Sequence, residues 1–396
     1  MLLLSIFHIV SILIVIGLLG ATLFTVFYHR FMYEKILRPK FDPSYQPRCS
    51  IILPCKGIPQ NFENNIRSYF NLNYNDFEVI FTVERENDPC VPLIKKVIQS
   101  EPRASLAVAG ITTKCSQKNF NMLAALDIAH DPEVYVFADS DIHLSENWLR
   151  ELILPLSKPA ITVTSGFRWL YSSSGKIGEI VNAYQNSMLL ILFSTASFLQ
   201  GMGLWGGSMA IKKRDFDELG VRDYWAQTVV DDMSLSRLIA KNSKKSIMVS
   251  PCITPTDDTL PTIRQSIKWF ERQVMFLKAY QRKTWVGAIA LVISCLFFQL
   301  LLPVSIIISF ATSRTFAGIG GISALTFLFG TLLTAFFYPM LGKQPTRFRF
   351  LLFQPLSLFT VLVGVFKTLF TNTVKWSGFW YKLNFSGKVI SVEHEG

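Results

Sequence analysis

The stretch Val134-Tyr-Val-Phe-Ala-Asp-Ser-Asp141 decides how this chain is interpreted. Its first five residues are apolar, as in a strand that is buried on both faces. Two carboxylates, Asp139 and Asp141, follow at once. Because acidic groups one residue apart repel each other unless a cation lies between them, the pattern indicates a site for Mg²⁺ or Mn²⁺, which prefer oxygen ligands. A turn or a helix cap is the alternative for so short a motif.

Upstream of this stretch, apolar strand-like runs alternate with helical patterns. The predicted strands lie at residues 49–54, 77–83 and 105–109. The predicted helices lie near residues 60–71, 90–100 and 117–130. This order predicts an α/β domain with a mostly parallel, Rossmann-like sheet. Such sheets bind ligands at the carboxyl ends of their strands, and Lys56 lies just past the first of them.

A second acidic pair, Asp231-Asp232, opens a stretch with helical apolar periodicity. Acidic residues are favoured at a helix start by the helix dipole, so capping is one interpretation. The other is catalysis, because an acceptor hydroxyl must lose its proton as it attacks, and a positioned carboxylate can take it.

The stretch Arg264-Gln-Ser-Ile-Lys-Trp269 lies on a predicted helix that ends near the membrane. Four of its side chains recur at helical spacing and should share one face: Gln265, Lys268, Trp269 and Arg272. A face with cations, an amide and an indole can hold a leaving diphosphate. A basic face that extends its charges from the membrane surface into water is the alternative.

The loop Gly201-Met-Gly-Leu-Trp-Gly-Gly207 places four glycines around one tryptophan. Glycine lets the backbone approach a ligand closely. Trp205 is then a candidate for stacking against that ligand.

Composition predicts a domain that lies beside a membrane. Half of the 396 residues are hydrophobic, and charged residues make up 17 %, below the roughly 25 % of soluble domains. The net charge of +11 suits lipid headgroups or a phosphate-bearing substrate. No nucleic-acid motif is present, so we expect no nucleic-acid partner. HExxH, GxGxxG and Walker motifs are also missing, which argues against zinc hydrolysis, hydride transfer and P-loop chemistry.

Apolar runs at both ends predict membrane segments. Residues 2–27 carry no charged side chain and are long enough to span a bilayer, and basic residues follow at 30–40. The positive-inside bias therefore predicts a cytoplasmic domain. Further apolar runs lie at residues 286–311, 317–340 and 350–371. The last is interrupted by Gln354 and Pro355, so it either spans the membrane, is re-entrant or lies at the membrane interface.

We accordingly expect four parts. They are an N-terminal anchor (1–28), a cytoplasmic catalytic domain (29–284), C-terminal transmembrane or re-entrant helices (285–372) and a tail (373–396). The apolar run Met188–Leu199 inside the domain is too short to span a bilayer. It predicts either a buried helix or one that lies on the membrane surface.

Taken in order, these pieces resemble the inverting, GT-A-fold glycosyltransferases of the family-2 type. They are most similar to the ceramide glucosyltransferases of family 21 and to bacterial relatives that glycosylate membrane lipids. The residues that carry the resemblance are Pro54-Cys-Lys56-Gly57 with Asn61, Asn64 and Asn65, Asp88-Pro89, Lys118 with Asn121, Asp139-Ser140-Asp141, the loop 201–208, Asp231-Asp232, Gln265-Ser-Ile-Lys268-Trp269 and Trp376-Ser-Gly378-Phe-Trp-Tyr381.

The resemblance implies a UDP-sugar donor, with glucose the expected sugar, and a membrane-lipid acceptor such as ceramide. It assigns the metal to Asp139 and Asp141 and the catalytic base to Asp232. The donor-binding residues that it implies are Lys56, Glu84, Lys118, Asp139, Gln265, Lys268, Trp269 and Arg272. Trp205 and Gly207 would face the acceptor.

Three positions depart from the family pattern. Lys268 stands where arginine is usual and cannot form a two-pronged hydrogen bond, although Arg272 one turn later can compensate. Asp231 replaces the usual glutamate. Glu84 stands where relatives carry an aspartate for the nucleobase.

Other functions stay open on these residues. A processive polysaccharide synthase would share the fold but needs more membrane helices, and a transporter or scaffold would not need paired acidic clusters. Diacylglycerol or a hopanoid could be the acceptor, and N-acetylglucosamine the sugar. The bacterial inner membrane is favoured over the Golgi as the location.

Overall fold

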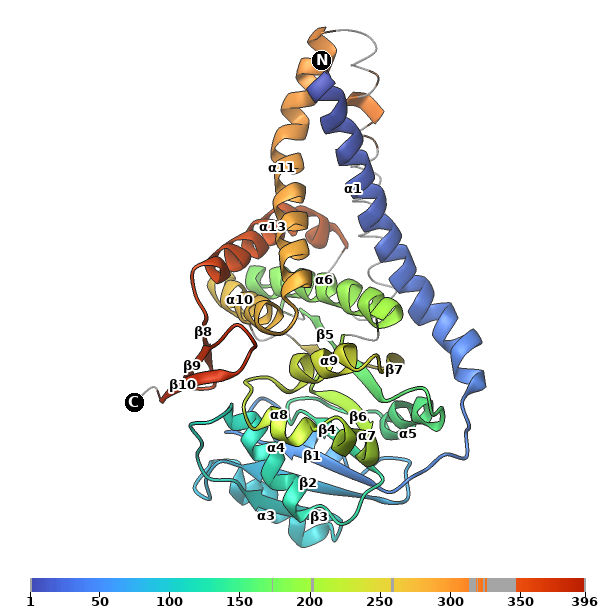
Figure 1. Cartoon of the computed structure of the whole chain (residues 1–396), viewed down its shortest axis with the longest axis vertical. Coiled ribbons are helices and arrows are strands. Elements are labelled where there is room, and N and C mark those ends of the chain that lie inside the picture. Colours follow the sequence, from blue (N-terminus) through green and yellow to red (C-terminus); the bar gives the residue numbers. More distant parts are fainter. Residues whose placement is uncertain are drawn as a thin grey trace.

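The computed structural model describes residues 2–172, 174–200, 203–257, 260–312, 318, 320–322, 325 and 347–394 (Figure 1). Within these residues the central sheet has seven strands: β1 (Cys49–Pro54), β2 (Phe77–Val83), β3 (Ala104–Val108), β4 (Val134–Ala138), β5 (Val163–Tyr171), β6 (Ser208–Lys212) and β7 (Ser246–Asp257). The strand order is β3-β2-β1-β4-β6-β5-β7. The four strands predicted from the sequence are confirmed.

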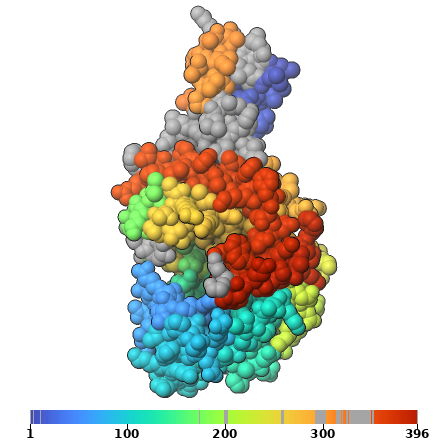
Figure 2. All heavy atoms as spheres, turned by 90° about the vertical axis from the view of Figure 1, so that its left-hand side faces the viewer, coloured from blue at the N-terminus to red at the C-terminus, as the bar shows by residue number. Residues whose placement is uncertain are grey.

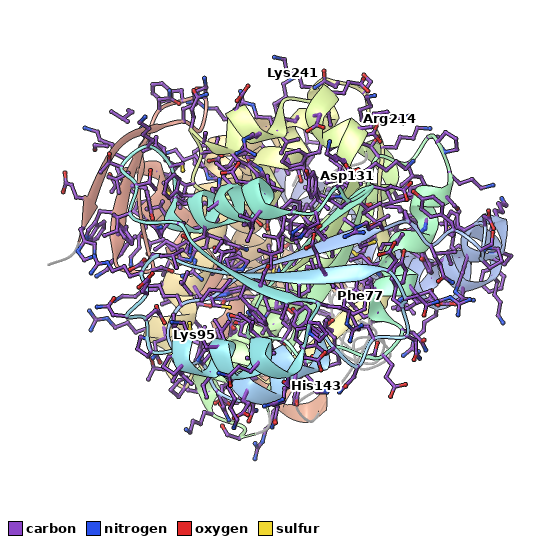
Figure 3. The ribbon with its side chains drawn as sticks, turned by 90° about the horizontal axis from the view of Figure 1, so that it is seen from below. Phe77, Lys95, Asp131, His143, Arg214 and Lys241 are labelled. Atoms are coloured by element: carbon purple, nitrogen blue, oxygen red, sulfur yellow. The ribbon has the colours of Figure 1, made fainter. Side chains whose placement is uncertain are left out.

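The described helices are α1 (Leu2–Phe27), α2 (Phe62–Ser68), α3 (Val91–Ser100), α4 (Gln117–Ile128), α5 (Trp148–Ile153), α6 (Ile177–Gln200), α7 (Lys213–Glu218), α8 (Val221–Trp225), α9 (Asp231–Lys241), α10 (Ile263–Tyr280), α11 (Arg282–Thr312) and α13 (Arg347–Leu369). Short 3-10 turns lie at Arg38–Lys40 and Leu154–Ser157. Helices cover both sides of the sheet: α3, with Lys95, lies on one side, and α7 and α9, with Arg214 and Lys241, on the other (Figure 3).

The apolar strands are buried because their alternate side chains enter two separate cores. In β4, Val134 and Val136 join one hydrophobic cluster, while Tyr135 and Phe137 join the other. Successive side chains of a strand point to opposite faces, so a strand covered on both sides needs apolar residues throughout. Phe137 packs edge-on against Trp225, with 4.8 Å between ring centres.

The strand pairing brings the polar residues to one edge of the sheet. β1 runs parallel to both β2 and β4, so their carboxyl ends meet there. β6 is antiparallel to β4 and pairs Ser208 with Ala138, so the chain enters β6 at that same edge. The mostly parallel sheet expected from the sequence is therefore confirmed.

Two sets of apolar helices differ in direction. In Figure 1, α1 and α11 run along the long axis of the molecule, whereas α6, α10 and α13 lie across it. Among the described helices, two are long and apolar enough to cross a membrane, at Ser5–Lys40 and Leu352–Leu369. Met188–Leu199 forms part of α6. Most of the apolar run 317–340 lies outside the described residues.

The first helix continues directly into the domain that contains the central sheet. A wider, π-helical segment, Tyr28–Leu37, follows α1 directly. Its buried His29 hydrogen-bonds both to Ser194 of α6 and to Ser250 of β7, each at 2.9 Å. Tyr28 donates a hydrogen bond to the Met248 carbonyl at 2.9 Å. These contacts fix the direction of α1 relative to the sheet.

The C-terminal segment forms a second, antiparallel sheet of β8 (Thr373–Trp376), β9 (Phe379–Leu383) and β10 (Val389–His394). Figure 2 shows this segment as one continuous band, from α13 down to the domain that contains the central sheet. The Val389 N–H donates to the Gln227 carbonyl at 2.9 Å, which ties the small sheet to the loop before α9. The C-terminal segment thus lies against that domain.

Candidate active site

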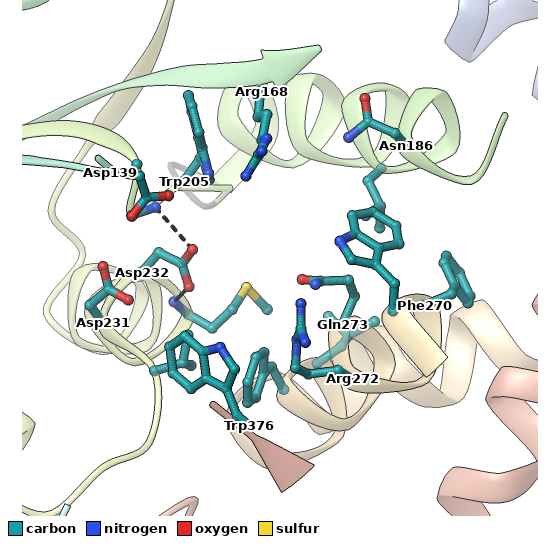
Figure 4. A pocket seen from close by; sticks show the side chains of 18 of the residues that line it. Asp139, Arg168, Asn186, Trp205, Asp231, Asp232, Phe270, Arg272, Gln273 and Trp376 are labelled. Carbon is teal, nitrogen blue, oxygen red and sulfur yellow. Dashed lines mark hydrogen bonds between the residues drawn. The ribbon is translucent and has the colours of Figure 1, made fainter. Parts of the chain in front are cut away.

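A single cavity of about 750 Å³ joins the edge of the sheet to the crosswise helices (Figure 4). Its polar end is lined by Lys56, Gln117, Lys118, Asn121, Asp139, Asp141, Arg168, Asp231 and Asp232. Its apolar end is lined by Met188, Leu189, Leu192 and Phe193 of α6, Phe276 and Leu277 of α10, Ala288 of α11, and Val361 and Val365 of α13.

Lys118 links the two acidic pairs. Its Nζ lies 3.0 Å from Asp139 Oδ1 and 3.3 Å from Asp231 Oδ2. Burial alone would lower the pKa of Lys118, but the carboxylates of Asp139, Asp231 and Asp232 outweigh burial and raise it. Lys118 therefore stays charged and holds together carboxylates that would otherwise repel each other.

Asp232 is held at the start of α9 with its carboxylate in the cavity. The Gly206 N–H donates to Oδ2 at 3.0 Å, and the Met233 N–H donates to Oδ1. Burial, followed by the charge of Asp231, raises the pKa of Asp232 to about 7. A carboxylate with a pKa near neutrality suits proton abstraction at the same pH.

Asp141 is paired with a cation, Arg168, which also lines the cavity. Its Oδ2 accepts a hydrogen bond from Arg168 Nη1 at 2.9 Å. Its Oδ1 is shielded from solvent and accepts no hydrogen bond from any described residue. Because a buried carboxylate oxygen without a partner is costly, this atom is a candidate ligand for a cation.

The loop requires glycine at positions 206 and 207, where it contacts the aspartates. A Cβ on Gly206 would overlap the carboxylate of Asp231, and one on Gly207 would overlap Asp139 and the ring of Trp205. The backbone can therefore lie directly against both acidic pairs. Trp205 lines the cavity, as does Gly207. Gly201 and Met202 lie outside the described residues.

Part of the predicted α10 face reaches the cavity. Trp269 and Arg272 line it, together with Gln273. Burial, with Arg168 nearby, lowers the pKa of Arg272 to about 10, so its guanidinium keeps its charge at neutral pH. Among the described residues no carboxylate pairs with it.

The other two residues of that predicted face lie elsewhere. Gln265 is at the first turn of α10, where its side chain and Thr262 form a capping box. It is thus one turn short of the cavity. Lys268 is exposed, and it does not line the cavity.

Lys56 and Glu84 lie together at the ends of β1 and β2. Lys56 Nζ is 3.0 Å from Glu84 Oε2, and Lys56 reaches the cavity whereas Glu84 lies behind it. Asp88 has a structural role at this edge: its Oδ1 accepts hydrogen bonds from the N–H groups of Gly57 and Cys90.

The model of glycosyl transferase family 21 matches residues 10–389, nearly the whole chain. The chain belongs to glycosyl transferase family 21. The resemblance to family 21 that the ordered motifs predicted is thereby confirmed.

Individual relatives are more distant. Ceramide glucosyltransferases 1 and 3 of Caenorhabditis elegans are 22 % and 23 % identical to the chain over 216 and 212 residues. These matches cover 54 % and 53 % of this chain, and the chain spans only 46 % of the length of either relative.

A solved mannosyltransferase from Pyrobaculum calidifontis, in complex with GDP-Man and Mn²⁺, has a TM-score of 0.57 at 15 % identity. That comparison covers 92 % of this chain and 99 % of the other. The likeness shows the fold alone: this family 21 chain has the GT-A fold.

The cavity side chains that were not predicted as site residues from the sequence include Arg168, Asn186, Gln273 and Trp376. Arg168 comes from β5, a strand that the sequence analysis does not identify. Gln273 could have been found, because it stands one turn after Trp269 on the same helix. Asn186 precedes an apolar run on α6 and carries no local signal of its own.

Proposed function

We propose that this glycosyltransferase moves a hexose, with glucose the expected sugar, from a UDP-sugar to the hydroxyl of a membrane lipid such as ceramide. The observation that carries the proposal is the continuous cavity. Its acidic and basic end suits a sugar diphosphate, and its apolar end, between α6, α10, α11 and α13, suits lipid chains.

The polar end offers cations where a diphosphate would lie. Arg272 points into the cavity from α10, with Gln273 beside it, opposite Asp139 (Figure 4). A guanidinium without a carboxylate partner is well suited to a phosphate, which it can bind with two parallel hydrogen bonds. We assign Arg272 and Trp269 to the diphosphate. Lys56, Glu84 and Lys118 are assigned to the donor side.

Asp232 is the proposed base. It takes the proton of the acceptor hydroxyl while that oxygen forms a bond to the anomeric carbon. The bond from the anomeric carbon to the diphosphate breaks on the opposite side, so the configuration inverts and the nucleoside diphosphate leaves. Arg272 faces the charge that develops on the leaving group, and such preorganised charge is usually the largest catalytic contribution.

The residues present fit a divalent cation. Asp141 offers a buried oxygen without a hydrogen-bond partner, and Asp139 lies beside it in sequence. No cluster of three or more His, Cys, Asp or Glu side chains occurs in the described part of the chain. Protein sites hold Mg²⁺ or Mn²⁺ with one or two carboxylates plus substrate phosphates, and Asp139 and Asp141 are the carboxylates proposed here. When bound, the ion would neutralise charge on the diphosphate.

Removal of divalent ions with EDTA is therefore expected to abolish sugar transfer, and Mn²⁺ or Mg²⁺ should restore it. Asp141→Asn should raise the Mn²⁺ concentration needed for half-maximal activity about 10-fold or more. Binding of Mn²⁺ in the presence of UDP, followed by electron paramagnetic resonance, gives a second measurement. Full activity in EDTA would count against a metal at this site.

The proposed orientation places a bilayer around α1, one of the two candidate spans, and around α11, which contains the apolar run 286–311; the other candidate span, in α13, would then lie at the surface. The crosswise helices α6, α10 and α13 then lie at its surface, and the apolar end of the cavity faces the lipid chains. Residues 29–284, as the catalytic domain, would stay in the cytoplasm, with the bacterial inner membrane favoured over the Golgi. α13 would be an interfacial helix, because β8 returns from its end to the catalytic domain.

The test uses the full chain in lipid nanodiscs. It is supplied with labelled UDP-glucose, UDP-N-acetylglucosamine or GDP-mannose, and with ceramide, diacylglycerol or a hopanoid as acceptor. The expected result is label in one lipid product, identified by its mass, with UDP-glucose and ceramide the expected pair. A ladder of long polysaccharide, or no labelled lipid with any combination, would contradict the proposal.

A further inference from the structure

The C-terminal sheet carries a tight turn into the cavity. β8 ends at Trp376, and β9 begins at Phe379. The two residues between them, Ser377 and Gly378, have φ values of 51° and 84°. Both lie in the left-handed region that two-residue hairpin turns require, and glycine fills one position without strain. The turn places Trp376 and Ser377 in the cavity wall.

The hairpin holds Lys56 on two sides. The Ser377 carbonyl accepts a hydrogen bond from Lys56 Nζ at 3.1 Å, and the Phe379 ring lies 5.1 Å from the same nitrogen. Glu84 binds that nitrogen at 3.0 Å from the other side. The ammonium at the end of β1 is therefore positioned by a segment more than 300 residues later in the chain.

Several hydrogen bonds attach the small C-terminal sheet to the helices around the cavity, so the sheet can form part of the cavity wall. Tyr381 Oη accepts a hydrogen bond from the Gln117 N–H at 3.3 Å, at the start of α4. Tyr280 Oη donates to the Gly387 carbonyl at 2.8 Å, and Arg237 Nη1 donates to the Ser386 carbonyl at 2.8 Å. These contacts join the sheet to α4, α9 and α10, which carry or flank Lys118, Asp232 and Arg272.

Trp376 lies where the two ends of the cavity meet. Its ring packs edge-on against Phe276 of α10, with 5.7 Å between centres, while its neighbour Ser377 contacts Lys56. Figure 4 shows Trp376 along the wall near Arg272, on the side of the aspartates. No described residue hydrogen-bonds its indole N–H, so that donor is open to water or to a ligand in the cavity.

We propose that the C-terminal hairpin completes the donor site. Trp376 is a specificity-determining residue that packs against the transferred sugar, and Ser377 positions Lys56. An indole offers a large rigid face to the C–H side of a sugar ring and one N–H to a hydroxyl. This inference rests on the proposed sugar transfer, because it assigns the sugar part of that donor to a wall outside the main sheet.

The test compares Trp376→Ala with Trp380→Ala in the full chain. Trp380 is a matched control, because it lies on the same small sheet, is 40 % exposed and does not line the cavity. Trp376→Ala is expected to raise the KM for the nucleotide-sugar about 10-fold or more, while the KM for the lipid should change less than twofold. Trp376→Phe should recover most of the loss, and Trp380→Ala should match the unchanged protein.

Two further measurements separate the outcomes. Thermal unfolding shows whether Trp376→Ala is folded; if it is not, Trp376→Leu, which keeps apolar volume without an aromatic face, replaces it. Calorimetric titration with UDP-glucose and with UDP alone tests the inference directly. Trp376→Ala should weaken the binding of UDP-glucose far more than the binding of UDP. Equal donor KM and equal binding for the Trp376 and Trp380 variants would overturn it, even if lipid glycosylation is observed. If no lipid is glycosylated, the proposed function fails, and the binding result still decides this inference.

Discussion

Asp232→Asn is expected to lower kcat by roughly 10²–10⁴-fold while leaving the binding of the nucleoside diphosphate within about twofold. Asparagine keeps the size of the side chain and can still accept the hydrogen bond from Gly206, but it cannot take a proton. Steady-state transfer and calorimetric titration with UDP measure the two effects separately. Asp223→Asn, on the exposed surface of α8, is the control and should be unchanged.

The pH dependence gives the same assignment a second readout. Because the pKa of Asp232 is raised to about 7, the residue is mostly protonated, and inactive as a base, below that pH. Activity should therefore rise as pH increases through about 7. Near-full activity of Asp232→Asn, or a profile that is flat from pH 5 to 8, would show that another group accepts the proton.

Arg272→Met is expected to lower kcat by roughly 10²–10³-fold, the loss seen when one preorganised charge donor is removed from a transition state. Methionine keeps an apolar stem of similar reach and removes the cation that faces the leaving diphosphate. The variant should not be less stable, because it relieves the repulsion between Arg272 and Arg168. An unchanged or raised Tm together with a large loss of turnover would support the proposed role of Arg272.

Lys268→Met is the matched comparison for Arg272→Met. It stands one turn earlier on α10, is exposed, and lies outside the cavity wall. If the cation inside the cavity is the one that matters, Lys268→Met should keep most of its activity. A large loss for Lys268→Met with little for Arg272→Met would instead support the assignment that the resemblance gives to Lys268.

The first half of the catalytic domain could be predicted almost residue by residue. β4 is apolar throughout, and β1 and β2 are mostly apolar, because both faces of these strands are buried, so each stands out from the helical pattern around it. Their parallel pairing then placed Lys56 and Asp139 at the same edge. The metal-binding and catalytic roles of these residues stay predictions.

The second half could not be read in the same way. β5 contains Ser165, Gly166 and Arg168 because it passes the site, and those residues break its apolar pattern. β7 contains two prolines, which usually argue against a strand, and it tolerates them because it lies at the edge of the sheet. Neither strand carries a local signal strong enough to identify it.

Contacts between distant segments also could not be predicted from the sequence. Nothing near Trp376 in the chain indicates that its turn lies against Lys56, because that contact depends on how α13 crosses α6 and α10. Similarly, the spacing that groups Gln265 with Arg272 gives a helix face but not the point at which the cavity begins. The capping box with Thr262 places Gln265 at the helix end.

The junction at His29 bears on how the proposed lipid acceptor would reach the site. Hydrogen bonds to Ser194 and Ser250 join the end of α1 to the domain that contains the central sheet, so in the proposed orientation that domain would keep its direction relative to α1. The proposed base, Asp232, would then stay at a similar height above the bilayer. On the proposed function, a lipid would be glycosylated if its hydroxyl reached that height while its chains stayed in the leaflet. Bilayer thickness and the length of the headgroup, rather than extraction from the membrane, would then set which lipids are accepted.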